Sequence, residues 1–357
     1  MESQGRWMKF AAIGIAAALF ATGCASGGDP TTPTETDAAV DPEWQAVIDA
    51  ANEEGNVVWY TVSPEASREG LKAAFEEKYP DISVEIIVLG TADMTAALEA
   101  EHDTGADGAD VVTSVNFSWL AEKVEEPGWF TPLAGSEVAN PEWQDSGWVV
   151  DDTLIYSPLG LLVLGWNTQL FSGSIASYDD LLDPALGGGA IGIADAAVHP
   201  LQADYYAFLE ENTEPGFLED LAAQDPIVYP NALGMQEALF AGEIAVGTFV
   251  SASDMSAKKA EGVPVDYFVP DPVWGVPNVF LIPESAKNPN AAQLFMDFFL
   301  SEDGQRASAA GGATPLSAVR PDTIGGNSNV QLLNQEHMLD AAWFEEYVTT
   351  WKTTFGR

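Results

Sequence analysis

Short polar side chains recur directly after the apolar runs that predict buried strands. These candidate ligand-binding residues are Ser63, Ser114, Asn116, Asp195, His199, Ser251 and Ser253. In an open parallel sheet the residues beyond the C-terminal strand ends share one edge, where helix N-termini offer free N–H groups. Hydroxyl, amide, carboxylate and imidazole groups gathered at such an edge predict a hydrogen-bonding site for a small polar organic solute.

Three further residues belong to the predicted site because of their positions along the chain. Pro64 stands beside Ser63, while Tyr156 and Trp274 flank two long apolar runs. Each polar residue also has a local interpretation that stays open. Ser63 and Asn116 are of the types that cap helices, and His199 is also suited to a turn.

The charge of the predicted site leaves the ligand class open. Asp195 and Asp254 are compatible with a cationic or zwitterionic solute. Arg68 is nearly the only cation in these loops, so a strongly anionic ligand would depend on helix N-termini for its charge partner.

Catalytic signatures are missing from the sequence. It contains no G-x-S-x-G elbow, no H-E-x-x-H pair and no phosphate-binding glycine loop. The three histidines are scattered, which argues against a secreted α/β hydrolase, the alternative from the enzyme classes. We therefore expect a binding protein with no catalytic residues, no cofactor and no metal site.

The elements that position these residues alternate between strand and helix. Apolar runs at 57–60, 84–89 and 111–112 predict strands, separated by helical patterns at 71–79 and 94–98. A second unit repeats this order with strands at 191–194, 227–229 and 244–250. The βαβ rhythm predicts an α/β protein with a mostly parallel sheet, flanked by helices, in each of two lobes.

A long apolar run at 161–164 lies between these units, and another at 276–282 follows the second unit; together they predict a two-strand hinge. We expect lobe 1 to comprise 42–160 and 275–357, with lobe 2, residues 161–274, inserted into it. A chain of 357 residues is long enough for two such cores.

The N-terminus predicts export and lipid attachment. Arg6 and Lys9 precede a short apolar run and the sequence Ala21-Thr22-Gly23-Cys24, which resembles a bacterial lipoprotein cleavage box. We expect 1–23 to be a signal peptide, Cys24 to be the lipidated first residue, and 24–41 to be a flexible tether. An ordinary signal peptide with an incidental cysteine is the alternative.

The net charge of −42, from 13 basic and 55 acidic residues, excludes nucleic acid as a partner because phosphate backbones repel such a surface. The acidic residues are dispersed, which is typical of a solvated surface. We expect a monomer, extracytoplasmic and lipid-anchored to the cell membrane on its periplasmic or outer face.

Several segments resemble the substrate-binding lipoproteins of ABC importers, in the branch of family 1 solute-binding proteins that includes ferric-iron binders. They are 51–60, Gly108-Ala109-Asp110-Val111-Val112, Ser157-Pro158-Leu159-Gly160, 165–168, 177–184, 286–292 and 298–305. The resemblance implies the periplasmic-binding-protein fold, closure of two lobes around a solute, and ABC permease and ATPase subunits as partners. A binding lipoprotein that serves a sensor without transport is the other interpretation.

The chain departs from the iron-binding relatives at the position of their adjacent tyrosines. Val250-Ser251-Ala252-Ser253 stands there, and the pair Tyr205-Tyr206 lies within a helical pattern where neighbouring side chains diverge. We therefore favour a small polar organic solute over ferric iron, which prefers phenolate and carboxylate oxygens.

Changing Cys24 to Ala should release the protein from the membrane, because Cys24 is the only thiol available for lipid attachment. Fractionation of cells that express the parent and the variant measures this. A variant that sediments with membranes as fully as the parent does would refute lipid attachment at Cys24.

Overall fold

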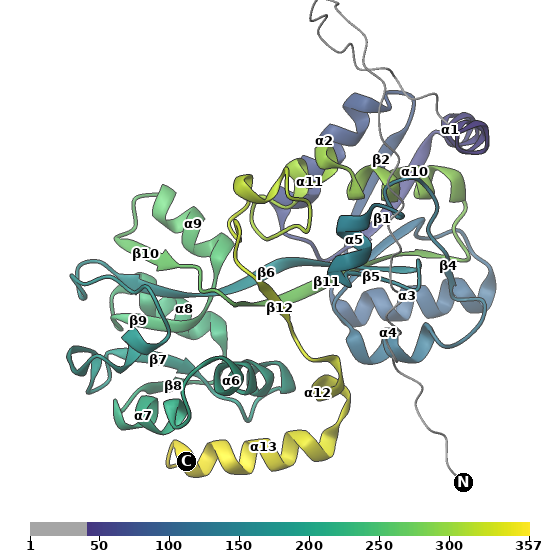
Figure 1. Cartoon of the computed structure of the whole chain (residues 1–357). Helices are drawn as coiled ribbons and strands as arrows, with labels where there is room; N and C mark the ends of the chain where they lie inside the picture. The colour runs from purple at the N-terminus through teal and green to yellow at the C-terminus, as the bar shows by residue number, and fades with distance from the viewer. Residues whose placement is uncertain (1–40) are drawn as a thin grey trace, which may run out of the picture. The chain divides into compact units, whose positions relative to one another are not determined.

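One mixed β-sheet runs through both lobes of the folded part (Figure 1). The computed structural model describes residues 41–357, so the predicted signal peptide, Cys24 and residues 24–40 of the tether lie outside the described residues. The strand order is β2-β1-β3-β11-β6-β9-β7-β8, with β4, β5, β10 and β12 paired at its sides. No helix in this described part is long and apolar enough to cross a membrane.

Lobe 1 is built on a parallel group in which β1 lies between β2 and β3. Its strands are β1 (Asn56–Thr61), β2 (Ser83–Val88), β3 (Val111–Ser114), β4 (Phe130–Thr131) and β5 (Val149–Val150). Its helices are α1 (Pro42–Glu54), α2 (Glu65–Lys78), α3 (Thr91–Thr104), α4 (Phe117–Lys123), α5 (Pro141–Ser146), α10 (Pro289–Leu300) and α11 (Glu302–Ser308).

Lobe 2 has its own parallel group, in which β7 lies between β8 and β9. Its strands are β7 (Ile191–Ala194), β8 (Ile227–Tyr229), β9 (Val246–Ser251) and β10 (Val265–Phe268). Its helices are α6 (Pro200–Asn212), α7 (Phe217–Ala223), α8 (Ala232–Ala241) and α9 (Ala252–Ala260), with short 3-10 turns at Asp179–Leu182 and Pro184–Leu186.

Two long antiparallel strands join the lobes. They are β6 (Leu154–Asn167) and β11 (Val273–Pro283), which pair with each other from Ile155↔Phe280 to Leu162↔Trp274. In lobe 1, β11 also pairs with β3; in lobe 2, β6 also pairs with β9. The register shifts between Val276 and Asn278, at the passage from one lobe to the other. This pair confirms the fold class expected from the two long apolar runs.

Helices cover both faces of the sheet in lobe 1 because alternate strand residues point to opposite faces. Phe280 packs with Trp59 and Phe299 on the face of α2 and α10. Val279 and Leu281 instead join Met94 and other residues of the core under α3 and α4. The continuous apolar sequence of β11 follows from this double covering.

The C-terminal segment departs from the expected division of the chain. The sequence predicts that 275–357 belongs to lobe 1, but α12 (Gln335–Leu339) packs on α6 of lobe 2 and on α4, and α13 (Ala341–Thr354) packs on α6 and α7 of lobe 2. The strand β12 (Val330–Leu332) leads there by pairing with the lobe 2 end of β11. Figure 1 shows α13 lying along lobe 2 and α12 between the lobes. The helical periodicity of this segment shows which face is apolar, not which lobe covers it.

A buried carboxylate in lobe 1 predicts a pH effect on stability. Asp297 in α10 is 9% exposed, and its Oδ1 accepts a hydrogen bond from the backbone N–H of Glu137 at 2.9 Å. Burial, followed by the charge of Glu137, raises the pKa of Asp297 to about 6. The folded state therefore binds this proton more tightly than the unfolded chain, and this group's contribution makes stability fall as pH rises from about 4 to 6.

Changing Asp297 to Asn keeps an oxygen for the Glu137 N–H and removes the buried charge. We expect the free energy of unfolding of the variant to exceed that of the parent by about 1–2 kcal/mol at pH 7.5. Near pH 4 the two free energies of unfolding should be equal, because the parent carboxyl is then protonated in the folded state. Urea unfolding at both pH values measures this. Asp103→Asn, at an exposed position, is the control, and an equal gain at both pH values would contradict the assignment.

Candidate functional site between the lobes

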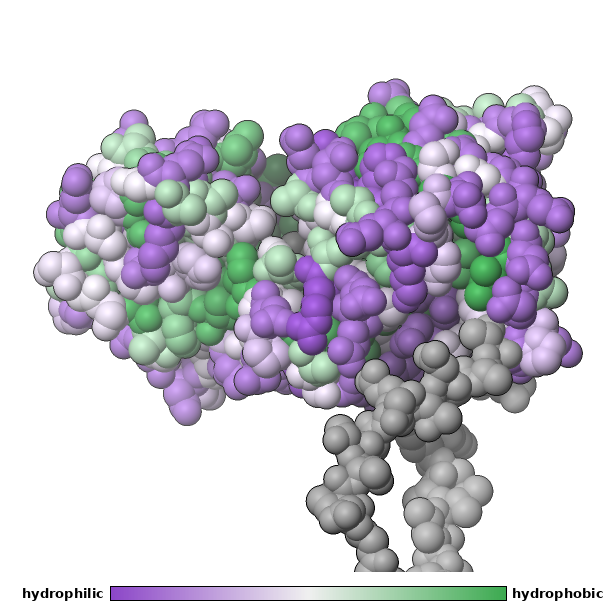
Figure 2. Space-filling view, turned by 90° about the horizontal axis from the view of Figure 1, so that it is seen from above, coloured by the Kyte–Doolittle hydropathy of each residue, from purple (hydrophilic) through white to green (hydrophobic). Residues whose placement is uncertain are grey.

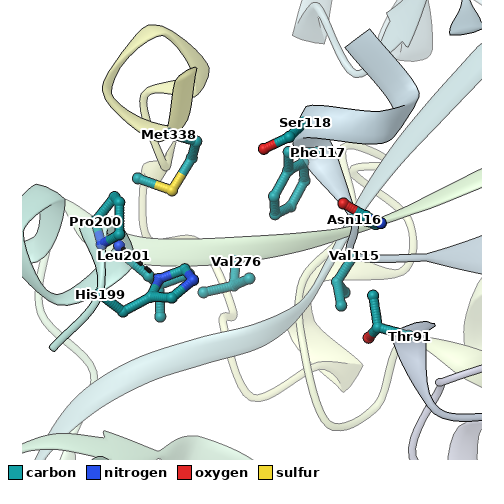
Figure 3. A pocket seen from close by; sticks show the side chains of 10 residues that line it. All are labelled: Thr91, Val115, Asn116, Phe117, Ser118, His199, Pro200, Leu201, Val276 and Met338. Atoms are coloured by element: carbon teal, nitrogen blue, oxygen red, sulfur yellow. Dashed lines mark hydrogen bonds between the residues drawn. The ribbon is translucent and has the colours of Figure 1, made fainter. Parts of the chain in front are cut away.

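The described part contains a cavity of about 560 Å³ between the lobes, within the size range of small-molecule sites. Its lining comprises Thr91, Val115, Asn116, Phe117, Ser118, His199, Pro200, Leu201, Val276 and Met338. Figure 3 shows the lobe 1 residues of α3 and α4 on one side, those of α6 on the other, and Val276 of β11 between them. Figure 2 is seen from the opposite side of the crossing strands, where a notch also separates the two lobes.

The lobe 1 wall is formed by the beginnings of two helices. Asn116 caps α4: its Oδ1 accepts from the Trp119 N–H at 3.4 Å, and its Nδ2 donates to Thr95 Oγ1 at 3.0 Å. Thr91 begins α3, whose N-terminus has no side-chain cap. The first N–H groups of α3 are therefore not occupied by a capping side chain at this edge of the cavity.

The lobe 2 wall is the N-terminus of α6. The Nδ1 of His199 accepts a hydrogen bond from the Leu201 N–H at 3.1 Å, and Pro200 occupies the first helical position, which lacks an N–H. This bond fixes the ring and leaves Nε2 as its hydrogen-bonding atom for a solute. The side chain of His199 is exposed, which agrees with a position at the cavity wall.

The cavity differs in charge from the rest of the molecule. No Asp, Glu, Lys or Arg lines it, and His199 is its one ionisable residue. Apolar side chains make up more than half of the lining, and the polar ones are hydroxyl, amide and imidazole groups. Such a lining suits an organic solute with both an apolar part and hydrogen-bonding groups.

Of the ten predicted site residues, the structure brings two, Asn116 and His199, into this cavity. Ser114 is buried, and its Oγ accepts a hydrogen bond from the Asn116 N–H. Ser114 therefore helps to hold the backbone of Asn116 in place without lining the cavity itself. Asp195 is half-buried and accepts from the Ala197 N–H at 2.9 Å, as turn residues commonly do.

Two predicted serines lie at the N-terminus of α9. The hydroxyls of Ser251 and Ser253 are 2.9 Å apart, and Ser251 caps the helix. A side chain at Gly311, in the loop after α11, would touch Ser253 at 3.4 Å, so lobe 1 closely approaches lobe 2 here. Figure 1 shows α9 and α11 on the side of the crossing strands opposite to α4, α6 and α12.

Ser63 is 3% exposed, and its hydroxyl makes no hydrogen bond within the described part of the chain. The hydroxyl of Ser157 in β6 likewise makes no hydrogen bond within the described residues. A buried hydroxyl without a partner costs free energy, so both serines could donate to a solute or a water molecule. Pro64 is exposed at the start of α2 and supplies no such group.

Trp274 and Tyr156 do not line the cavity. Trp274 is 1% exposed in the lobe 2 core and donates from Nε1 to Asp204 at 3.1 Å. Tyr156 is half-buried on β6. Burial raises the pKa of Tyr156.

The adjacent tyrosines are part of the lobe 2 core. Both are 1% exposed; Tyr205 donates its hydroxyl to the carbonyl of Thr248, and Tyr206 donates to that of Ala194. Burial raises the pKa of both phenols. The described residues also contain no cluster of three or more His, Cys, Asp or Glu side chains that could hold a metal ion.

Eight of the ten lining residues were not among the predicted site residues, and they include Thr91, Phe117, Val276 and Met338. Thr91 and Phe117 begin helices that follow strands, so the rule that selected Asn116 could have found them. Val276 belongs to a predicted crossing strand. No local signal indicates Met338, because its place depends on how the C-terminal segment packs.

Comparisons with known proteins agree with this arrangement. The family described as bacterial extracellular solute-binding protein matches residues 36–306. A search of curated proteins finds no match to the sequence.

Solved structures share the fold at low identity. The substrate-binding protein of an ABC transporter from Agrobacterium tumefaciens is 16% identical with a TM-score of 0.61, covering 86% of this chain and 97% of that one. The spermidine/putrescine-binding protein PotD from Streptococcus pneumoniae is 16% identical with a TM-score of 0.62, and the match covers 84% of this chain and 99% of that one. Iron-bound HitA from Pseudomonas aeruginosa is 18% identical with a TM-score of 0.55, and the match again covers 84% of this chain and 99% of that one.

The family match spans most of the chain, and the structural relatives are binding proteins with the same two-lobe fold. The chain belongs to the bacterial extracellular solute-binding proteins.

Proposed function

We propose that this protein captures a small, mainly uncharged organic solute in the cavity between α3, α4 and α6 and delivers it to an ABC permease. Closure of the lobes about β6 and β11 would enclose the solute and create the surface that the permease recognises. A lipid on Cys24 would hold the monomeric receptor at the membrane. The observation that carries the proposal is a cavity walled by both lobes and lined without charged carboxylate, ammonium or guanidinium groups.

The chemistry of the lining narrows the ligand class. A polyamine needs acidic partners, and neither Asp195 nor Asp254 lines the cavity. Asp254 instead accepts a hydrogen bond from Gln236 at 2.8 Å. These observations favour solutes with hydroxyl, amide or carbonyl groups beside an apolar portion over those bound by the polyamine- and iron-binding relatives.

Native mass spectrometry of protein purified from its source should reveal a retained solute. A thermal-shift panel of amino acids, organic acids, sugars, polyamines and ferric citrate then tests the ligand class. Small-angle scattering should show a smaller radius of gyration with the bound compound. A panel in which polyamines alone bind would overturn the proposed class.

Changing Asn116 or His199 to Ala should weaken binding of the panel compound roughly 5- to 150-fold, because each loses a hydrogen bond inside a closed site. Calorimetry measures this. Asn231→Ala is the matched control, since Asn231 caps α8 as Asn116 caps α4 but does not line the cavity. Unchanged affinity in both cavity variants would mean that the solute binds elsewhere.

Ferric citrate should produce no visible tyrosinate-to-iron band, because Tyr205 and Tyr206 direct their hydroxyls to backbone carbonyls in the core. Absorption titration of the purified protein measures this. A strong band that disappears in Tyr205→Phe or Tyr206→Phe would show that iron binds at this pair.

A further inference from the structure

The C-terminal helices are fastened to lobe 2 by aromatic and polar contacts. In α13, the ring of Trp351 packs on that of Tyr206 with centroids 5.5 Å apart, and the Tyr347 hydroxyl donates to Glu210 at 2.6 Å. Both partners belong to α6, the helix whose N-terminus forms the lobe 2 wall of the cavity. The segment is therefore attached to a part of the protein that contributes directly to the site.

A further attachment is made by a buried carboxylate. Asp204 of α6 is 3% exposed, and its Oδ1 lies 2.6 Å from Nδ1 of His337 in α12. Its Oδ2 accepts from Trp274 Nε1 and from the backbone N–H of Asn334, each at 3.1 Å. Three donors thus compensate for the burial of one carboxylate, and two of them come from the C-terminal segment.

The imidazole of His337 is held on its other side by an aromatic ring. It stacks on Trp343 with centroids 3.7 Å apart and an interplanar angle of 3°. Trp343 lies in the first turn of α13, so the stack also fixes the angle between the two helices. Hydrogen bonding and stacking together give His337 one defined position.

This position determines where the next residue lies. Met338 follows His337 and lines the cavity, where Figure 3 shows it above Val276, between Phe117 of lobe 1 and Pro200 of lobe 2. The helix α12 contacts α4 as well as α6. The helix therefore bridges both walls of the solute site.

We propose that α12 is a wall of the solute site, with Met338 as a residue that contacts the solute and His337 as the residue that positions it. The inference rests on the proposed function, because it assigns a contact in the same cavity. A thioether side chain is flexible and polarisable, so Met338 would adapt to the apolar part of the solute. The selectivity of the site then depends on a segment beyond the two hinge strands.

The positioning role is tested without any ligand. Changing His337 to Phe keeps a ring to stack on Trp343 and removes the bond to Asp204. Hydrogen exchange of the amides of 335–339 should become about tenfold faster, while the core strands stay protected. His337→Gln is the second variant, and unaltered exchange of this segment in both variants overturns the positioning role.

The contact with the solute is tested by two neighbouring residues on α12. Met338→Ala should bind the compound with the largest thermal shift in the panel roughly 5- to 20-fold more weakly. Leu339→Ala is the matched control, because Leu339 is 51% exposed and does not line the cavity.

The result separates this inference from the proposed function. If Asn116→Ala weakens binding and Met338→Ala does not, the solute binds in the cavity as proposed, but the role assigned to α12 is wrong. If none of the cavity variants changes the affinity, the proposed function fails together with the role of Met338.

Discussion

The pairing of β6 with β11 is the constraint on which the rest of the structure depends. Each strand has one end in lobe 1 and the other in lobe 2, so their register fixes the parallel groups of both lobes at once. Because the C-terminal ends of both groups face the crossing, the helices that follow those strands begin there. The register shift between Val276 and Asn278 lies where the chain passes between lobes, and Val276 lines the cavity.

Helix capping and the lining of the cavity use the same residues at this crossing. Asn116 and His199 each accept a hydrogen bond from an N–H of their own helix and also line the cavity, so helix capping and a place at the cavity wall are compatible for both residues. A capped residue has a fixed side chain, which lowers the entropy lost when a solute binds. A solute that meets these groups would therefore encounter donors and acceptors that are already oriented.

Local features predicted the elements well and the site less well. Strands β7 and β8 lie at the residues expected, because an apolar run acts over a few positions. Trp274 was expected near the site but fills the lobe 2 core, since a flanking position does not show which way a side chain points. Met338 was not expected at all, because its location follows from contacts between residues more than a hundred positions apart, such as Asp204 with His337.

The charge of the molecule bears on how the lobes close. Acidic residues are spread over both lobes, and the net charge of −42 makes approach of one lobe to the other electrostatically unfavourable. Exposed ion pairs such as Lys258 with Glu261 contribute little against this repulsion. Salt screens charges beyond about 8 Å at physiological ionic strength, so the repulsion acts mainly between facing rims. The uncharged lining does not add to this repulsion inside the cavity. In the proposed closure, contacts with the solute would supply the remaining free energy.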